Sequence, residues 1–452
     1  MKNTWPRIDY EHAEAWDCYQ KQLSVEYRQS MEEGKDVASL KDLFEAADRL
    51  PAGPEKAQIA DALFSLVQAA PLRPDFPYRE PSDLECIRAE RLPGPKLPGT
   101  LPDRDSLREK IRGAWYGRIA GCLLGKPIEG MRTDHLHPLL RETGNMPMHR
   151  YIRSAELTDA LCKEHYLSRD RCWGDRVTVA PDDDDTNYTV LAQQLICQTG
   201  RAFTTEDVGK IWISRQPKSA YCTAERVAYL NLLRGLLPPE TAAFQNPYRE
   251  WIGAQIRGDY FGYICPGAPE AAAELAWRDA RLSHVKNGIY GEMYVAAMLA
   301  AAAVSELPRL VIEAGLSQIP GASRLYHSVR RLLDDFDRGT DAETCFARIH
   351  AQYNEHDPHD WCHTIPNALI VTAALLYGDG DYSRSVCLAV QCGFDTDCNG
   401  ATTGSITGMM KGFGAIDPAW TEPLHGTLKT ALAWTPTFSI EELVDQTLAH
   451  IS

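Results

Sequence analysis

Carboxylates gather in two short segments that lie more than two hundred residues apart in the sequence. The first segment, 181–188, holds a run of aspartates that ends at Asp185, and the second, 393–400, holds Asp395 and Asp397. Both adjoin apolar helical stretches without a run of basic residues nearby, and carboxylates in apolar surroundings need a compensating cation. Hard divalent cations such as Mg²⁺, Mn²⁺ and Ca²⁺ bind oxygen ligands of this kind. The sequence therefore predicts a metal site where the two segments meet, although the first segment alone also fits a solvated acidic turn that caps a helix starting near Tyr188.

Two better-known motifs do not fit these residues. Asp395, Asp397 and Asn399 match the first half of an EF-hand loop, but Ile406 stands at position twelve, where the loop requires a bidentate glutamate. The glycines before Lys126 resemble a phosphate-binding loop, yet their spacing differs and no Ser or Thr follows the lysine. Neither an EF-hand nor a P-loop is predicted.

Glycines recur at every fourth position in two further segments. On a helix this spacing places them on one face, where they permit close approach of a second helix and so offset the cost of about 1 kcal/mol per glycine. Glu129 follows the first of these glycine ridges, and Asp395 and Asp397 precede the second. We therefore expect both ridges to lie near the acidic site. Their glycines are Gly113, Gly117, Gly121 and Gly125 in the first, and Gly400, Gly404, Gly408 and Gly412 in the second.

Apolar periodicity indicates that helices carry these segments. The pattern predicts an all-α main domain with few strands, the best strand candidate being 176–180. The apolar stretch 295–304 is too short to span a bilayer and is typical of a buried helix. Helices are predicted over 107–124, 191–197, 271–282, 294–303, 326–336, 367–377 and 383–392.

A change in composition divides the chain. Residues from about 10 to 70 show amphipathic helical periodicity, and prolines then become frequent up to Pro102, which is typical of extended chain. We predict an N-terminal helical extension over 1–92, a proline-rich linker over 93–104 and a catalytic domain over 105–452. The extension holds none of the acidic motifs, so we expect it to lie outside the catalytic centre.

Composition limits the function classes. The 452 residues carry a net charge of −15, which disfavours nucleic-acid binding and attachment to an anionic membrane. No apolar leader follows the first methionine, and the 13 cysteines form no CxxC pair. Free thiols in a reducing compartment predict a cytoplasmic protein. The oligomeric state does not follow from the sequence.

Three motifs in this order resemble the ADP-ribosylglycohydrolase family, which includes the dinitrogenase-reductase-activating glycohydrolases and the ADP-ribosyl-acceptor hydrolases. They are GRIAGCLLGKPIE at 117–129, DDDT at 183–186 and DTD at 395–397. The resemblance covers scattered blocks between about 108 and 415, and each motif is weak alone but specific in combination. It implies an all-α, multi-helix bundle with a central binuclear-metal cleft, to which this chain adds its N-terminal helical extension.

The resemblance also implies the metal ligands. One or two Mg²⁺ ions, or Mn²⁺, are expected at five carboxylates: Asp183, Asp184, Asp185, Asp395 and Asp397. Three positions depart from the family pattern. Asp183 replaces a hydroxyl residue, Cys398 replaces a threonine ligand, and Cys122 stands where many members have aspartate. Because a thiol is a poor ligand for Mg²⁺, the second ion could be weak, completed by water or missing.

The remaining site residues follow from the same resemblance. Glu129 and Asp184 are the expected general acid and base, with their individual roles left open. Residues that match the family's cleft-lining blocks are expected to bind substrate. A buried core histidine explains His284 equally well, and for Tyr290 a core role is favoured over stacking on a base. The expected substrate-binding residues are His284, Asn287, Gly288 and Tyr290.

Together these features predict a metal-dependent hydrolase that cleaves an N- or O-glycosidic ADP-ribosyl bond. Its expected partner is an ADP-ribosylated protein or a small ribosyl substrate. Two alternatives stay open: a hydrolase of another small ribosyl or furanosyl glycoside, and a catalytically silent module that binds ADP-ribose.

Overall fold

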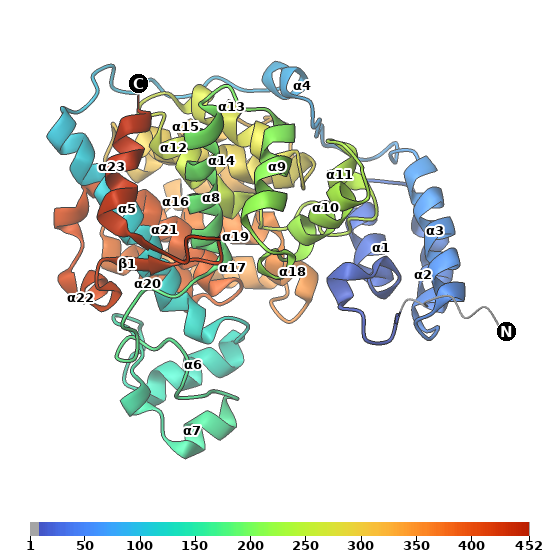
Figure 1. Cartoon of the computed structure of the whole chain (residues 1–452), viewed down its shortest axis with the longest axis horizontal. Helices are drawn as coiled ribbons and strands as arrows, with labels where there is room; N and C mark the ends of the chain where they lie inside the picture. Colours follow the sequence, from blue (N-terminus) through green and yellow to red (C-terminus); the bar gives the residue numbers. More distant parts are fainter. Residues whose placement is uncertain (1–8, 452) are drawn as a thin grey trace.

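The structure is a computed structural model that describes residues 9–451, and helices dominate it (Figure 1). The described residues contain one small sheet, in which β1 (Thr427–Lys429) pairs antiparallel with β2 (Thr437–Ser439), so that Leu428 lies opposite Phe438. The all-α prediction is confirmed. The strand predicted at 176–180 is wrong, because only Ala180 forms an isolated bridge, to Leu428.

Two glycine-rich helices form the centre of the bundle: α5 (Arg104–Gly125) and α21 (Thr396–Lys411). Their glycines face each other so closely that a Cβ atom added to Gly121 would lie 2.1 Å from the carbonyl oxygen of Gly400. Gly117 meets Gly404 in the same way, at 2.3 Å. The predicted close approach of the two ridges is therefore confirmed, and backbone-to-backbone packing explains the regular glycine spacing.

Other buried helices surround this pair. In α14 (Lys286–Ala302) every residue after Lys286 is buried, which confirms the buried helix expected from its alanine-rich sequence. The remaining inner helices are α8 (Asp184–Thr199), α12 (Asp259–Tyr263), α13 (Pro269–Ala280), α19 (Thr364–Gly378) and α20 (Tyr382–Gln391). None of the helices described is long and apolar enough to cross a membrane.

Shorter or more peripheral helices complete the main body. Figure 1 shows α6 and α7 extending away from the bundle, on the chain segment between α5 and α8. The peripheral helices are α6 (Thr133–Glu142), α7 (Asp159–Glu164), α9 (Thr205–Arg215), α10 (Thr223–Leu233), α11 (Glu240–Ala243), α15 (Pro308–Leu316), α16 (Arg324–Asp337), α17 (Ala342–Gln352), α18 (Pro358–Cys362), α22 (Pro418–Thr421) and α23 (Ile440–His450). Single 3₁₀ turns occur at Ala15–Asp17 (η1), Tyr19–Lys21 (η2), Ala38–Leu40 (η3), Lys126–Ile128 (η4), Ser154–Glu156 (η5), Lys218–Ala220 (η6), Gln255–Arg257 (η7), Phe413–Ala415 (η8) and Glu422–Leu424 (η9).

The N-terminal helices lie together at one end of the molecule (Figure 1). Helices α1 (Leu23–Glu32), α2 (Lys41–Asp48) and α3 (Pro54–Ala69) enclose a small core of their own, which includes Leu23, Phe44 and Leu63. The next helix, α4 (Leu84–Ala89), behaves differently, because its apolar side chains join the main core. The proline-rich chain that follows, up to α5, has almost no regular structure. The division into domains stays a prediction, with α4 as the part of the extension that packs into the catalytic body.

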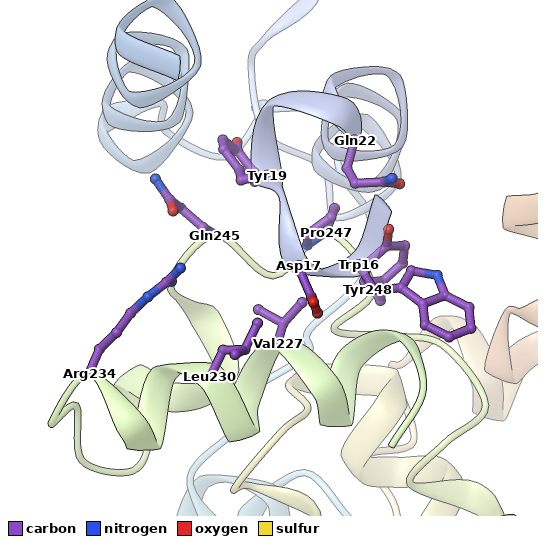
Figure 2. A pocket seen from close by; sticks show the side chains of 10 residues that line it. All are labelled: Trp16, Asp17, Tyr19, Gln22, Val227, Leu230, Arg234, Gln245, Pro247 and Tyr248. Carbon is purple, nitrogen blue, oxygen red and sulfur yellow. The ribbon is translucent and has the colours of Figure 1, made fainter. Parts of the chain in front are cut away.

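Polar contacts join these N-terminal helices to the main body. Figure 2 shows Trp16 and Asp17 next to Val227 on α10, around a cavity of about 20 Å³. Asp17 accepts hydrogen bonds from Lys218 and, at 2.6 Å, from Nε of Arg226. This joint combines charge pairing with apolar packing of Trp16 against Val227.

Deeper in the same interface, buried charges pair across the chain. Arg249 donates to Glu26 of α1 at 3.0 Å and to Glu33 at 2.5 Å. Arg324, at the start of α16, lies between Glu80 and Glu250 and reaches a carboxylate oxygen of each at 2.7 Å. Such pairs stabilise little when complete, but loss of one partner leaves a buried charge uncompensated.

Replacing Arg324 by methionine should therefore destabilise the protein by about 3–5 kcal/mol, because Glu80 and Glu250 would remain buried without a cation. The matched control is Arg309→Met. Arg309 also bridges two carboxylates, Glu313 and Asp337, but its side chain is 30% exposed and the expected loss is below about 1 kcal/mol. Denaturant unfolding followed by circular dichroism measures both losses, and equal losses would contradict the buried-charge account.

Candidate metal centre

Three helix ends bring the acidic motifs together. Asp183 caps the N-terminus of α8, where its carboxylate accepts a hydrogen bond from the backbone N–H of Asp185 at 3.0 Å. Asp395 stands in the same position before α21, and Asp397 lies in the first turn of that helix. The partial positive charge of a helix N-terminus favours carboxylates there. Glu129 follows the C-terminal end of α5, directly after η4.

The two aspartate segments meet in space. Asp183, Asp184, Asp185 and Asp397 each offer a carboxylate oxygen, and these four oxygens lie within 4.8 Å of one another. Asp395 lies close enough that its charge raises the pKa of Glu129 and of Asp185. The structure thus brings together the carboxylates that the sequence placed in one site.

Only two basic side chains of the described residues form ion pairs with these carboxylates. Lys126 of η4 donates to Asp183 at 2.5 Å. Arg118 of α5 is fully buried and lies between Asp185 and Asp259, at 3.0 Å from each. The basic groups were not predicted as site residues, although a charged residue inside an apolar glycine ridge was a sequence signal for a buried ion pair.

Two carboxylate oxygens in this cluster have no hydrogen-bond partner: Oδ2 of Asp185 and Oδ1 of Asp397, both buried. A buried polar atom without a partner costs free energy, and a buried charge costs more. A divalent cation would satisfy both oxygens and neutralise the excess negative charge. The donor set present in the structure therefore fits a cation bound through oxygen.

The carboxyl pKa values reflect the crowding. Burial, followed by the charge of neighbouring carboxylates, raises the pKa of Asp184 and of Asp397 well above the ordinary value. Burial also raises the pKa of Asp185, and Arg118 opposes that rise. Asp183 differs, because Lys126 holds its pKa below the ordinary value against the effect of burial. A bound cation would favour the charged form of every one of these groups.

Glu129 combines a raised pKa with access to an open pocket. Burial raises its pKa to about 7, and the charges of Asp395 and Asp183 add to the effect. The pocket has a volume of about 240 Å³ and is lined by Glu129, Arg132, Arg171 and two histidines, His135 and His165. A carboxyl group that titrates near neutral pH at the wall of a pocket has the properties of a general acid or base.

The residues expected to bind substrate lie elsewhere. His284 is 1% exposed and its Nδ1 lies 2.8 Å from the hydroxyl of Ser283. Asn287 donates to Glu80 and Glu250 at 2.8 Å, and Tyr290 donates to the carbonyl of Pro81. Gly288 packs so tightly that an added Cβ would lie 2.6 Å from the carbonyl oxygen of Arg249.

Asn287 and Tyr290 therefore contact Glu80, Glu250 and Pro81, whereas His284 and Gly288 pack inside the main body. None of them belongs to the carboxylate group described above, and their part in substrate binding stays a prediction.

A second group with metal-like composition lies between α1 and α18: Glu32, His359 and His363. Trp251 donates to Nδ1 of His359 at 3.2 Å, and the backbone N–H of Ile365 donates to Nδ1 of His363 at 3.1 Å. Each neutral ring must then carry its proton on Nε2, the atom that faces Glu32. An Nε2–H cannot coordinate a cation. Nε2 of His359 lies 3.0 Å from the carboxylate of Glu32, whereas Nε2 of His363 lies 3.8 Å from it and has no hydrogen-bond partner. This group forms a joint between the N-terminal helices and the main body.

We expect this joint to lose stability in mild acid. Burial lowers the pKa of His363 to about 4, and the neighbouring His359 adds to this effect while the charge of Glu32 opposes it. Between about pH 6.5 and 4 the unfolded chain then binds more protons than the folded chain, so the free energy of unfolding falls as the pH falls. Thermal melts of wild type and His363→Asn over this range should show a shallower slope for the variant, whose side-chain oxygen can still cap α19. Identical slopes would assign the acid sensitivity to other groups.

Comparison with known proteins identifies one protein family. The chain matches the family described as ADP-ribosylglycohydrolase over residues 103–451. A solved structure described as an ADP-ribosylglycohydrolase-related protein complex is 19% identical, with a TM-score of 0.48, and the match covers 76% of this chain and 98% of that one. A comparison with curated protein sequences found no match. Since the family match extends over well more than half of the sequence, the chain belongs to the ADP-ribosylglycohydrolase family and is an enzyme of the glycohydrolase class.

Proposed function

We propose that this enzyme hydrolyses the N- or O-glycosidic bond between ADP-ribose and an acceptor, with one or two divalent cations held by Asp183, Asp184, Asp185, Asp395 and Asp397. The observation that carries the proposal is the meeting of four carboxylates within 4.8 Å, two of them with unpartnered buried oxygens, beside Glu129 and its pocket. A divalent cation bound there would supply Lewis acidity towards ribose hydroxyls and water. We propose the substrate, the metal dependence and the roles of the single residues together.

The protein's own groups have separable tasks. Cleavage of a ribosyl bond develops positive charge at the anomeric carbon and requires proton transfer to the leaving group or from water. Glu129, with its pKa of about 7, can exchange a proton at its carboxyl oxygen at neutral pH. Lys126 holds Asp183 ionised, and Arg118 fixes the carboxylate of Asp185. These two basic side chains orient the metal-binding carboxylates and take no part in proton transfer.

The pocket next to Glu129 suits an anionic substrate. Arg132 and Arg171 place two guanidinium groups on its wall. Arg171 is anchored by donation to the carbonyl of Pro127 at 2.8 Å, which fixes the charge near the cluster. Guanidinium groups bind phosphate oxygens through paired N–H donors, so a diphosphate is the part of ADP-ribose that this wall would contact.

A direct assay tests the proposal. The full-length enzyme is incubated with ADP-ribosyl-arginine peptide, ADP-ribosyl-serine peptide or a simple riboside, in Mg²⁺, in Mn²⁺ or in chelator, and released ADP-ribose is measured by chromatography. We expect release from an ADP-ribosyl peptide that depends on the added cation. Release from simple ribosides alone, or ADP-ribose binding without any turnover in Mg²⁺, would contradict the proposal.

Replacing Glu129 by glutamine should lower the rate about 100-fold or more, the range typical for loss of a general acid or base. The variant keeps the shape of the side chain, so ADP-ribose affinity measured by calorimetry should change little. The control is Glu343→Gln, on the exposed surface of α17, which should hydrolyse substrate at the wild-type rate. A Glu129→Gln enzyme with full activity would remove Glu129 from the catalytic step.

A further inference from the structure

Thiols stand among the carboxylates of the metal centre. Cys398, in the first turn of α21, has its sulfur within 4.8 Å of a carboxylate oxygen of Asp185 and of Asp397, which also lie within that distance of each other. Cys122 of α5 forms a similar group with Asp183 and Asp185. Both cysteines are buried, and neither forms a disulfide.

We propose that this centre selects a thiophilic divalent cation of the Zn²⁺ and Co²⁺ class over Mg²⁺, with the thiolate of Cys398 as a ligand beside Asp185 and Asp397. The inference rests on the proposed function, since it names the class of cation that the same carboxylate cluster takes. It concerns a position at which this chain departs from the family pattern: this chain has Cys398 where the pattern has a threonine.

The geometry permits shared coordination. Ligand atoms bound to one tetrahedral Zn²⁺ at about 2.0–2.3 Å lie about 3.3–3.8 Å apart. The sulfur of Cys398 and the oxygens of Asp185 and Asp397 lie within 4.8 Å of one another, so small side-chain movements suffice to close the site. The unpartnered oxygens of these two aspartates provide the independent sign of a missing ligand.

The chemistry of the donors decides the type of cation. Mg²⁺ prefers oxygen ligands in octahedral geometry and binds sulfur poorly, whereas Zn²⁺ and Co²⁺ accept mixed sulfur and oxygen sets. Binding replaces the thiol proton of Cys398 by the cation, and the proton leaves to solvent. With a thiolate and two carboxylates around it, a divalent cation would be held by three negative groups.

A simple packing role does not explain where the thiols are found. Buried cysteine often behaves as a small apolar side chain, and Cys387 of α20 is such a case, 4% exposed within the main core. Cys398 belongs to the same core, at 5% exposed, but unlike Cys387 it adjoins the carboxylates of Asp185 and Asp395. A third thiol, that of Cys362, lies 3.8 Å from Asp395. Several thiols directed at carboxylates are what a mixed-donor site requires.

The test uses Co²⁺ as a spectroscopic probe of the full-length protein freed of metal with a chelator. Wild type should bind Co²⁺ with a sulfur-to-metal charge-transfer band in the near ultraviolet, and Cys398→Ser should lose most of that band. Cys387→Ser is the matched control and should keep it. Since loss of even an outer partner of a ligand weakens binding about 10–100-fold, Zn²⁺ affinity of Cys398→Ser, measured by calorimetry, should fall at least about tenfold.

A further variant checks the selectivity. Cys398→Thr restores an oxygen ligand and should shift the ratio of Zn²⁺ to Mg²⁺ affinity towards Mg²⁺ by at least about tenfold. Stoichiometric Co²⁺ binding without a charge-transfer band, in a wild type that hydrolyses ADP-ribosyl peptide, would overturn the thiol ligand while the proposed function stands. A wild type that binds neither Co²⁺ nor Mg²⁺ would overturn both.

Discussion

Replacing Asp397 by asparagine should abolish cation binding and hydrolysis, and it should stabilise the metal-free protein. Asp397 is 2% exposed, and burial and the charge of Glu129 raise its pKa well above the ordinary 3.8. Folding at neutral pH must therefore either bury its charge or take up a proton. Asparagine has nearly the same shape and carries no charge, so the free-energy cost of burying or protonating the carboxylate disappears. The same change removes a negatively charged metal ligand.

The magnitudes are large enough to measure. Loss of one charged group that stabilises a transition state lowers rates by about 10²–10³-fold. The metal-free variant should be more stable than the wild type, because the raised pKa of Asp397 means that folding disfavours its charged form. The gain should be present at neutral pH and vanish below about pH 4, where the unfolded aspartate is protonated as well.

The experiment compares thermal melts with and without cation. Asp397→Asn should melt above wild type in chelator and should not respond to added Mg²⁺ or Zn²⁺. The control is Asp445→Asn, on the exposed side of α23, which should leave both the melting temperature and the cation response unchanged. A less stable variant in chelator would show that Asp397 has a structural partner and belongs to the fold rather than to the site.

Much of the fold could be predicted because its signals are local. Apolar spacing at helical period predicts amphipathic helices, and alanine-rich sequence predicted the buried α14. The glycine ridges carried long-range information as well, since glycine at every fourth position has little purpose without a closely packed partner. With two such ridges in one chain, each predicts the other as its packing partner, and α5 and α21 do pack along them.

The acidic site was foreseeable for a related reason. Carboxylates next to apolar helices are costly unless they share a cation, so two such segments indicate one site. A neutral polar residue needs no cation, so the sequence does not predict which partner it will bond with. Asn287 and Tyr290 could have faced a ligand, yet they bond with Glu80 and Pro81 in an extended segment whose course no periodic pattern predicts.

Charge pairing across the N-terminal joint was equally hidden. Glu26 and Glu33 resemble the solvent-facing residues of an ordinary amphipathic helix, and only the folded structure shows them buried against Arg249. The strand expected at 176–180 failed because β-branched residues favour a strand only when a partner is available. In the structure the segment meets β1 at one residue, Ala180.

Replacing Gly121 by alanine should destabilise the protein by more than about 3 kcal/mol, beyond the usual cost of overpacking a core. In an exposed helix the same change would stabilise by about 1 kcal/mol. The sign reverses here because the new methyl carbon would lie 2.1 Å from the carbonyl oxygen of Gly400, and a backbone atom in a packed helix cannot rotate away as a side chain can. Gly404→Leu adds a larger side chain at the same helix contact and should also destabilise the protein.

The clash should also reach the metal centre, because it forces apart the two helices that position its residues. Cys122 lies in α5, Glu129 follows that helix, and Asp397 lies in the first turn of α21. We therefore expect weaker cation binding in Gly121→Ala as well as a lower free energy of unfolding in denaturant. The matched control is Gly414→Ala, where nothing lies within 4 Å of an added Cβ and stability should stay within about 0.5 kcal/mol of wild type. A Gly121→Ala protein as stable as the control would mean that the ridges do not touch, and the site geometry built on their contact would fail with them.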